Sequence, residues 1–236
     1  GLIFGLGYLI ENQGFRKSPY AYRHEFLANY LTGRQSFILE YKGDVKKLVG
    51  EQDLQIHLRA LGPFNQSNFF GYGNNTVYLK DEEHEISFYR NRYDYVNADI
   101  FLGYELVKNA RIFYGSTSEL YHSKADKNEE HFFNEFNQTN PEEAIFGTKF
   151  FTGLAAGFDF DTRDNKANAK KGLRLFTRLD WKAELGGQER KFTALESSLS
   201  LYKTVFNDYL TLANRTGMQT VFGDPYFYQH AQIGGE

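Results

Sequence analysis

Along most of this chain, apolar and polar residues alternate with a period of two, in segments of about ten residues separated by polar or Gly-containing turns. Residues 172–185 are the clearest case. One face of this segment carries Leu173, Leu175, Leu179 and Trp181, and the other carries Arg174, Arg178, Asp180 and Lys182. Comparable patterns predict strands at residues 1–10, 20–31, 36–45, 52–61, 95–107, 110–121, 148–161, 191–204 and 208–221, with a weaker one between 76 and 92. Helical periodicity is almost absent, so the chain is expected to be all-β, with about eleven strands.

Composition indicates where such strands reside. Aromatic residues make up 17% of the chain, yet the mean hydropathy is −0.56. A transmembrane antiparallel β-barrel reconciles the two values, because one face of each strand meets lipid, the other meets a polar lumen, and aromatic residues gather at both interfaces. No segment approaches the ~20 apolar residues of a membrane helix. We therefore expect a barrel in a bacterial outer membrane, with the Leu173 face toward lipid and the Arg174 face toward the lumen.

The chemistry-bearing residues give no enzymatic pattern. The net charge of −3 gives no hint of a nucleic-acid partner, and the absence of cysteine excludes disulfides and thiolate sites. The run Asp159, Asp161, Asp164 and Asn165 lacks the spacing of a calcium loop. We therefore expect Asp161 and Asp164 to accept hydrogen bonds from the turn backbone, and Arg163 to pair locally. His122 and His131, with Glu129 and Glu130, match no zinc spacing. We expect no catalytic, cofactor or metal site, and a lumen or interface role for His24 and His57.

The lengths of the connections suggest an orientation. Residues 32–34, 108–109 and 206–207 form short turns, which are expected at one end of the barrel, and the polar segment 122–147 reads as a long surface loop at the other. The connections 63–75 and 162–171 are long for periplasmic turns.

One stretch resembles a known family. Residues 157–165 (GFDFDTRDN), followed by Lys171-Gly172-Leu173-Arg174, resemble the strand–turn–strand of the BamA/TamA superfamily of outer-membrane translocation barrels. The element consists of Asp161, Arg163, Asp164, Asn165, Lys171 and Gly172. A second stretch resembles the approach to that family's sixth extracellular loop, with Gly223, Asp224, Pro225, Gly234 and Gly235.

The resemblance implies a barrel of about sixteen strands whose sixth loop follows strand eleven. The barrel domain would then span residues 1–236 and be incomplete, with an Arg-Gly pair and an aromatic residue expected beyond Glu236. Residues 14–24 and 68–74 resemble a Bacteroidetes subgroup in which the barrel follows a periplasmic phosphoesterase domain.

The resemblance also implies a function, which is insertion of proteins into, or transport across, the outer membrane. Its partners would be membrane lipid, substrate outer-membrane proteins and periplasmic accessory proteins. The first strand would form a weak seam, for which Gly1, Gly5 and Gly7 are candidates; alternatively these glycines only fit the lumen. A passive pore and a membrane anchor for an upstream enzymatic domain are the other functions that the sequence leaves open.

Overall fold

The computed structural model describes residues 1–17, 19–73, 76, 85–206 and 209–231. Its strands are β1 (Ile3–Asn12), β2 (Tyr22–Leu31), β3 (Ser36–Val49), β4 (Gln52–Asn68), β5 (Arg90–Val107), β6 (Ala110–Ser123), β7 (Gly147–Asp161), β8 (Lys171–Glu184), β9 (Lys191–Val205) and β10 (Leu210–Gly223). The only α-helix among these residues, α1 (Phe132–Thr139), lies between β6 and β7 with the 3₁₀ turns η1 (Ala125–Lys127) and η2 (Pro141–Glu143), and η3 (Phe227–Gln229) follows β10. The expectation of an all-β chain is confirmed.

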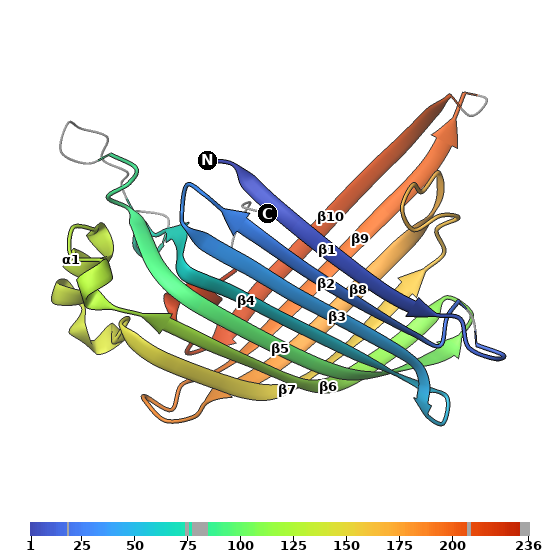
Figure 1. Ribbon diagram of the computed structural model, residues 1–236, viewed down its shortest axis with the longest axis horizontal. Helices are drawn as coiled ribbons and strands as arrows, with labels where there is room; N and C mark the ends of the chain where they lie inside the picture. The colour runs from blue at the N-terminus through green and yellow to red at the C-terminus, as the bar shows by residue number, and fades with distance from the viewer. Residues whose placement is uncertain (18, 74–75, 77–84, 207–208, 232–236) are drawn as a thin grey trace.

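All ten strands belong to one antiparallel sheet, in sequence order from β1 to β10. The sheet curves strongly along its length, and β1 and β10 form its two edges (Figure 1). Among the described residues these edge strands are not hydrogen-bonded to each other, so the sheet is a partial barrel with a concave and a convex face. Within the described part of the chain, no helix is both long and apolar enough to cross a membrane.

The alternation in the sequence maps onto the two faces. On β8, the convex residues Leu179 and Trp181 are 49% and 48% exposed, whereas the concave Lys182 is 6% exposed. In a membrane barrel the outer face of each strand meets hydrocarbon, so leucine and tryptophan are exposed there while lysine on the other face is buried. The expected orientation of the Leu173 and Arg174 faces therefore agrees with the structure.

The two ends of the sheet differ. We call the end with the described residues 32–35, 69–73, 85–89, 124–146, 185–190 and 224–231 the loop rim, and the end with the described residues 13–17, 19–21, 50–51, 108–109, 162–170, 206 and 209 the turn rim. They lie at the left and right of Figure 1. The expectation that 32–34 shares an end with 108–109 is wrong, because these connections lie at opposite rims. The connection after β4 belongs to the loop rim, so it is not an unusually long turn, whereas 162–170 is long for the turn rim.

The region between β4 and β5 differs most from expectation. Strand β4 continues through Pro63 to Asn68, past a register irregularity between Leu61 and Asn65, where a loop was expected. Of the strand expected between 76 and 92, residues 77–84 lie outside the described part, residues 86–89 form a turn, and residues 90–92 begin β5. The described residues thus contain ten strands, one fewer than the pattern predicted.

Candidate functional site

The concave face carries ion pairs that join strands distant in the sequence. The Arg178 guanidinium on β8 donates to both carboxylate oxygens of Asp99 on β5, at 3.0 and 3.2 Å, and to Asp180 at 2.8 Å. Asp99 is 4% exposed. A buried carboxylate is tolerated when it is paired and hydrogen-bonded, as Asp99 is here. These contacts connect β5 and β8 across the concave face of the sheet.

A second buried pair lies nearer the loop rim. The Lys182 ammonium is 2.7 Å from a carboxylate oxygen of Glu119, and the two side chains are 8% and 5% exposed. Glu119 also accepts hydrogen bonds from the Tyr95 hydroxyl on β5, at 3.3 Å, and from the Gln229 side-chain amide. Glu119 is therefore a hub that joins β5, β6 and β8 to the segment after β10.

That segment, residues 224–231, which we call the C-terminal segment, folds back onto the concave face. The Tyr226 hydroxyl donates to Glu184 on β8 at 3.2 Å, and the Arg190 guanidinium lies 4.2 Å from the centre of the Tyr226 ring. Tyr226 is 1% exposed and packs with Phe151 and Phe192. The segment is thus anchored through both the polar and the apolar part of one tyrosine.

Aromatic stacking holds the next two residues. The Tyr228 ring stacks on Tyr121 with centroids 4.1 Å apart and an interplanar angle of 6°. Phe227 contacts Phe69 and Phe133, members of a cluster that also includes Ile145, Phe132, Phe136 and Phe146. This cluster brings the connection after β4, helix α1 and the C-terminal segment together, and so covers the concave face at the loop rim.

The family-motif turn holds itself through its acidic side chains. Asp161 accepts two side-chain hydrogen bonds from Arg163, at 2.9 and 2.8 Å. Asp164 accepts from the backbone N–H groups of Asn165, Lys170 and Lys171, at 3.0, 2.9 and 3.1 Å, and these bonds hold the pKa of its carboxyl below the usual range.

Gly172 completes the turn. Its φ is +105°, and a Cβ there would collide with the Thr162 carbonyl and the Arg163 backbone. Asn165 caps the backbone N–H groups of Ala167 and Asn168, at 2.8 and 3.0 Å. These acidic and amide oxygens serve the turn backbone, and no group of three or more His, Asp or Glu among the described residues is arranged to hold a metal ion.

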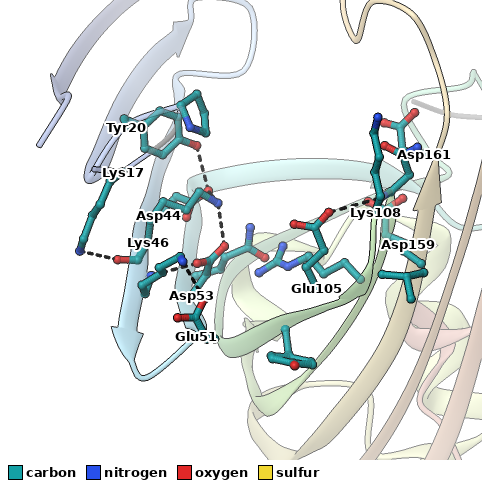
Figure 2. A pocket seen from close by; sticks show the side chains of 18 of the residues that line it. Lys17, Tyr20, Asp44, Lys46, Glu51, Asp53, Glu105, Lys108, Asp159 and Asp161 are labelled. Carbon is teal, nitrogen blue, oxygen red and sulfur yellow. Dashed lines mark hydrogen bonds and ion pairs between the residues drawn. The ribbon is translucent and has the colours of Figure 1, made fainter. Parts of the chain in front are cut away.

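A polar cavity of about 720 Å³ opens at the turn rim (Figure 2). On one side, the Tyr20 hydroxyl donates to Asp44 at 2.9 Å, and Lys46 bridges Asp44 and Asp53 at 3.0 and 2.9 Å. On the other side lie Glu105, Asp159 and Asp161, with Lys108 near them. Charges of both signs line the cavity, and many are already paired, so it does not select a ligand of one charge.

The remaining candidate residues lie at the edges. Gly5 faces the concave side of edge strand β1, where a Cβ would meet the Asn29 side chain; Gly7 is on the same face, and Gly1 lies against the connection 32–35. Gly223 ends β10 with a φ of +102°, and Asp224 lies 3.4 Å from Arg190. Pro225 follows within the C-terminal segment, whereas Gly234 and Gly235 lie outside the described residues.

The residues that anchor the C-terminal segment were not singled out from the sequence. Alternation places Glu119, Lys182 and Glu184 on the polar face of their strands, but Glu119 and Gln229 are 110 positions apart and no local pattern links them. The run Tyr226-Phe227-Tyr228 was a usable signal, because three consecutive aromatic residues after a strand require several partners.

A curved antiparallel sheet with an apolar convex face and a paired, polar concave face defines a membrane β-barrel. The model of the Omp85 superfamily domain matches residues 40–236, and the chain belongs to this superfamily, as the resemblance to the BamA/TamA barrels implied. Members of the superfamily are outer-membrane proteins that act in protein insertion or translocation together with accessory proteins, and their barrel domains are not enzymes. Searches of curated proteins and of solved structures found no significant match.

Proposed function

We propose that this chain is the barrel of a protein that inserts outer-membrane proteins or moves polypeptides across the outer membrane. The observation that carries the proposal is the occupied concave face, because residues 224–231 and the cluster around Phe69 and Phe133 fill it at the loop rim. A passive pore needs an open channel, so this arrangement favours a barrel that handles polypeptides over one that conducts solutes. Membership of the Omp85 superfamily supports the same choice.

The loop rim is then the extracellular end. Outer-membrane barrels have short periplasmic turns and longer extracellular loops, and the connections at residues 50–51 and 108–109 are the shortest in the described chain. In this orientation the C-terminal segment enters the lumen from outside, and the cavity in Figure 2 faces the periplasm, where substrate and accessory proteins would approach.

Strand β1 is the proposed acceptor for substrate strands. An incoming strand adds to an edge through main-chain hydrogen bonds, and glycine weakens the resident strand. Two glycines, Gly5 and Gly7, lie within β1 on its concave face. The alternative, that they only fit the lumen, is supported at Gly5 by the Asn29 side chain occupying the space above it. We also propose that the chain belongs to the subgroup with an upstream phosphoesterase domain, which the resemblance of residues 14–24 and 68–74 supports.

The test is reconstitution of the full-length protein into liposomes with two measurements on the same vesicles. Insertion of an unfolded outer-membrane protein is followed by protease protection, and ion conductance is recorded across the same membranes. We expect faster insertion than in empty liposomes and low steady conductance. High conductance without faster insertion would assign a passive pore instead, and an equal insertion rate with low conductance would reject the proposed function.

A control variant separates insertion from damage to the sheet. Ser118 and Thr152 form a hydroxyl pair at 2.8 Å on the convex face of neighbouring strands β6 and β7. A disulfide between Ser118→Cys and Thr152→Cys should leave insertion unchanged, because these strands are already paired. A disulfide between Glu119→Cys and Gln229→Cys would fix the C-terminal segment, and should reduce insertion reversibly if that segment moves during the reaction.

A further inference from the structure

The convex face carries a shallow apolar groove across β1 to β5. Its floor is one row of residues paired in register, which are Leu6, Ala28, Leu39, Ala60 and Val96. The row is low because two of its members are alanines. It lies between two rows rich in aromatic side chains, with Phe4, Tyr30 and Phe37 on one side and Tyr8, Phe26 and Tyr41 on the other.

The groove has the size and chemistry of a site for a hydrocarbon chain. Its volume is about 530 Å³, and its side chains are almost all apolar. Leu39 and Val96 are 48% and 45% exposed, so the floor is open to the surroundings of the barrel. In a membrane those surroundings are lipid acyl chains, and a groove between ridges holds one chain in more contacts than a flat surface does.

A cationic pocket lies at the end of this groove on β5. The pocket has a volume of about 200 Å³, and Arg92, Lys124, Lys127, His122, Asp94 and Phe64 are among its lining residues. Asp94 lies two residues from Val96 on the same face of β5, toward the loop rim. Gly62 lies beside Asp94 on β4, where a Cβ would meet the Asp94 carboxylate, so no side chain from that position separates pocket from groove.

The pocket has an excess of positive charge. Arg92 and Lys124 form no side-chain ion pair with any described residue, and Lys127 is 3.9 Å from Asp126. Among the described residues, Asp94 is the acidic residue that lines the pocket and Asp126 lies beside Lys127, against three lysine and arginine side chains. Lys127 also lies 5.9 Å from the centre of the Phe64 ring. The cluster therefore suits a singly or doubly charged anion bordered by apolar surface.

The lysines are held in place by a buried residue. Asn128 is fully buried; its amide donates to the carbonyls of Arg92 and Lys124, at 3.2 and 2.8 Å, and its oxygen accepts from the Arg92 backbone N–H at 2.8 Å. Because these bonds fix the turn η1 on the end of β5, the backbone that carries Lys124 and Lys127 is held beside the pocket.

We propose that the groove and the pocket together form a binding site for one membrane lipid with a phosphate headgroup. The phosphate pairs with Arg92, Lys124 and Lys127 at the loop rim, and one acyl chain lies along the row from Val96 toward Leu6. Lysine and arginine near the membrane surface attract anionic headgroups, and arginine binds phosphate through parallel N–H donors. The site goes beyond the proposed function, because it holds lipid at a fixed place beside strand β1 whatever the barrel transports.

The test is native mass spectrometry of the full-length protein after exchange into an equimolar mixture of phosphatidylglycerol and phosphatidylcholine with identical acyl chains. We expect preferential retention of phosphatidylglycerol. Replacing all three cations, with Arg92→Gln, Lys124→Gln and Lys127→Gln, should lower the relative affinity on the order of a hundredfold. The double variant Lys124→Gln, Lys127→Gln changes only exposed side chains and should fold normally. A smaller loss of phosphatidylglycerol affinity in this variant therefore separates weaker binding from misfolding.

Ala60→Phe should fill the groove and lower retention of both lipids, with Ala156→Phe on the convex face of β7 as its matched control. Lys170→Gln with Lys171→Gln, at the turn rim, is the control for charge. Equal retention of the two lipids by the wild-type protein, or a preference unchanged by the triple substitution, would overturn the proposal. Glycerol phosphate competing as well as intact phosphatidylglycerol would also overturn it, because a free phosphate site would then suffice.

Discussion

Removal of the Glu119 carboxylate tests whether the concave-face hub holds the barrel and the C-terminal segment together. Lys182 is 6% exposed in the protein, and Glu119→Ala removes the partner of its 2.7 Å ion pair. Removing one partner of a buried pair costs roughly 3–5 kcal/mol, because the other charge is left uncompensated. Gln229 also loses its acceptor, and a hydrogen bond to a charged group contributes about 1.5–3 kcal/mol. These losses share one carboxylate, so they are not additive.

We therefore expect Glu119→Ala to lower the free energy of unfolding by about 3–5 kcal/mol. The assay is urea unfolding in phospholipid vesicles, followed by the shift in electrophoretic mobility between folded and unfolded barrel. Limited proteolysis after Tyr226 gives the second measurement, and the C-terminal segment should be cleaved faster in the variant.

The double variant Glu119→Ala, Lys182→Met distinguishes a buried charge from a general packing defect. Methionine fills similar space without a charge, so it should recover much of the lost stability while leaving the segment sensitive to protease. A loss below about 1 kcal/mol in Glu119→Ala, in the range of exposed pairs, would refute the reasoning. So would a double variant no more stable than the single one.

Three further substitutions test the faces, the segment and the turn. Leu179→Lys places a charge on the convex face and should lower the free energy of unfolding in vesicles by about 2–4 kcal/mol, measured by the same urea assay. A much smaller decrease would mean that this face meets water rather than lipid. Tyr226→Phe removes the hydroxyl bond to Glu184 and should cost about 1–3 kcal/mol by leaving a buried carboxylate short of a donor, again with faster cleavage of the segment. The pKa of Asp164 is held down by backbone hydrogen bonds, so its contribution is present above about pH 3.9 and is lost as the pH falls through the lower folded value; hydrogen exchange in residues 162–170 should accelerate there, and Asp164→Asn should remove that pH dependence.

The orientation of side chains could be predicted from the sequence because a strand offers only two faces. The period alone places Arg174, Arg178 and Lys182 on one face of the sheet. The ion-pair partners of these side chains could not be predicted from the period. Arg178 meets Asp99 across 79 positions, and this contact depends on how strongly the sheet curves, which alternation does not encode.

The strand expected between 76 and 92 explains the error at the rims, because β4 and β5 pair directly with each other. Each antiparallel strand reverses the chain, so adding a strand between 76 and 92 moved every later connection to the other end relative to 32–34. Strand β4 passes an irregularity near Pro63 and stays paired as far as Asn68. Its last residues are of types common in loops, so the sequence pattern placed the end of this strand too early. Local signals identified the strands on either side but could not fix their direction.

The curvature of the sheet depends on small residues on its concave face. A Cβ at Gly115 or Gly153 would collide with the backbone of the neighbouring strand, and at Gly157 with the Phe113 ring. All three glycines lie on the concave side of β6 and β7, where strands of a curved sheet crowd. Glycine weakens a strand, and here it permits the close approach that brings β5 and β8 within reach of one salt bridge. Substitution of these glycines would therefore flatten the sheet and separate Glu119 from the C-terminal segment, without touching any residue that binds it.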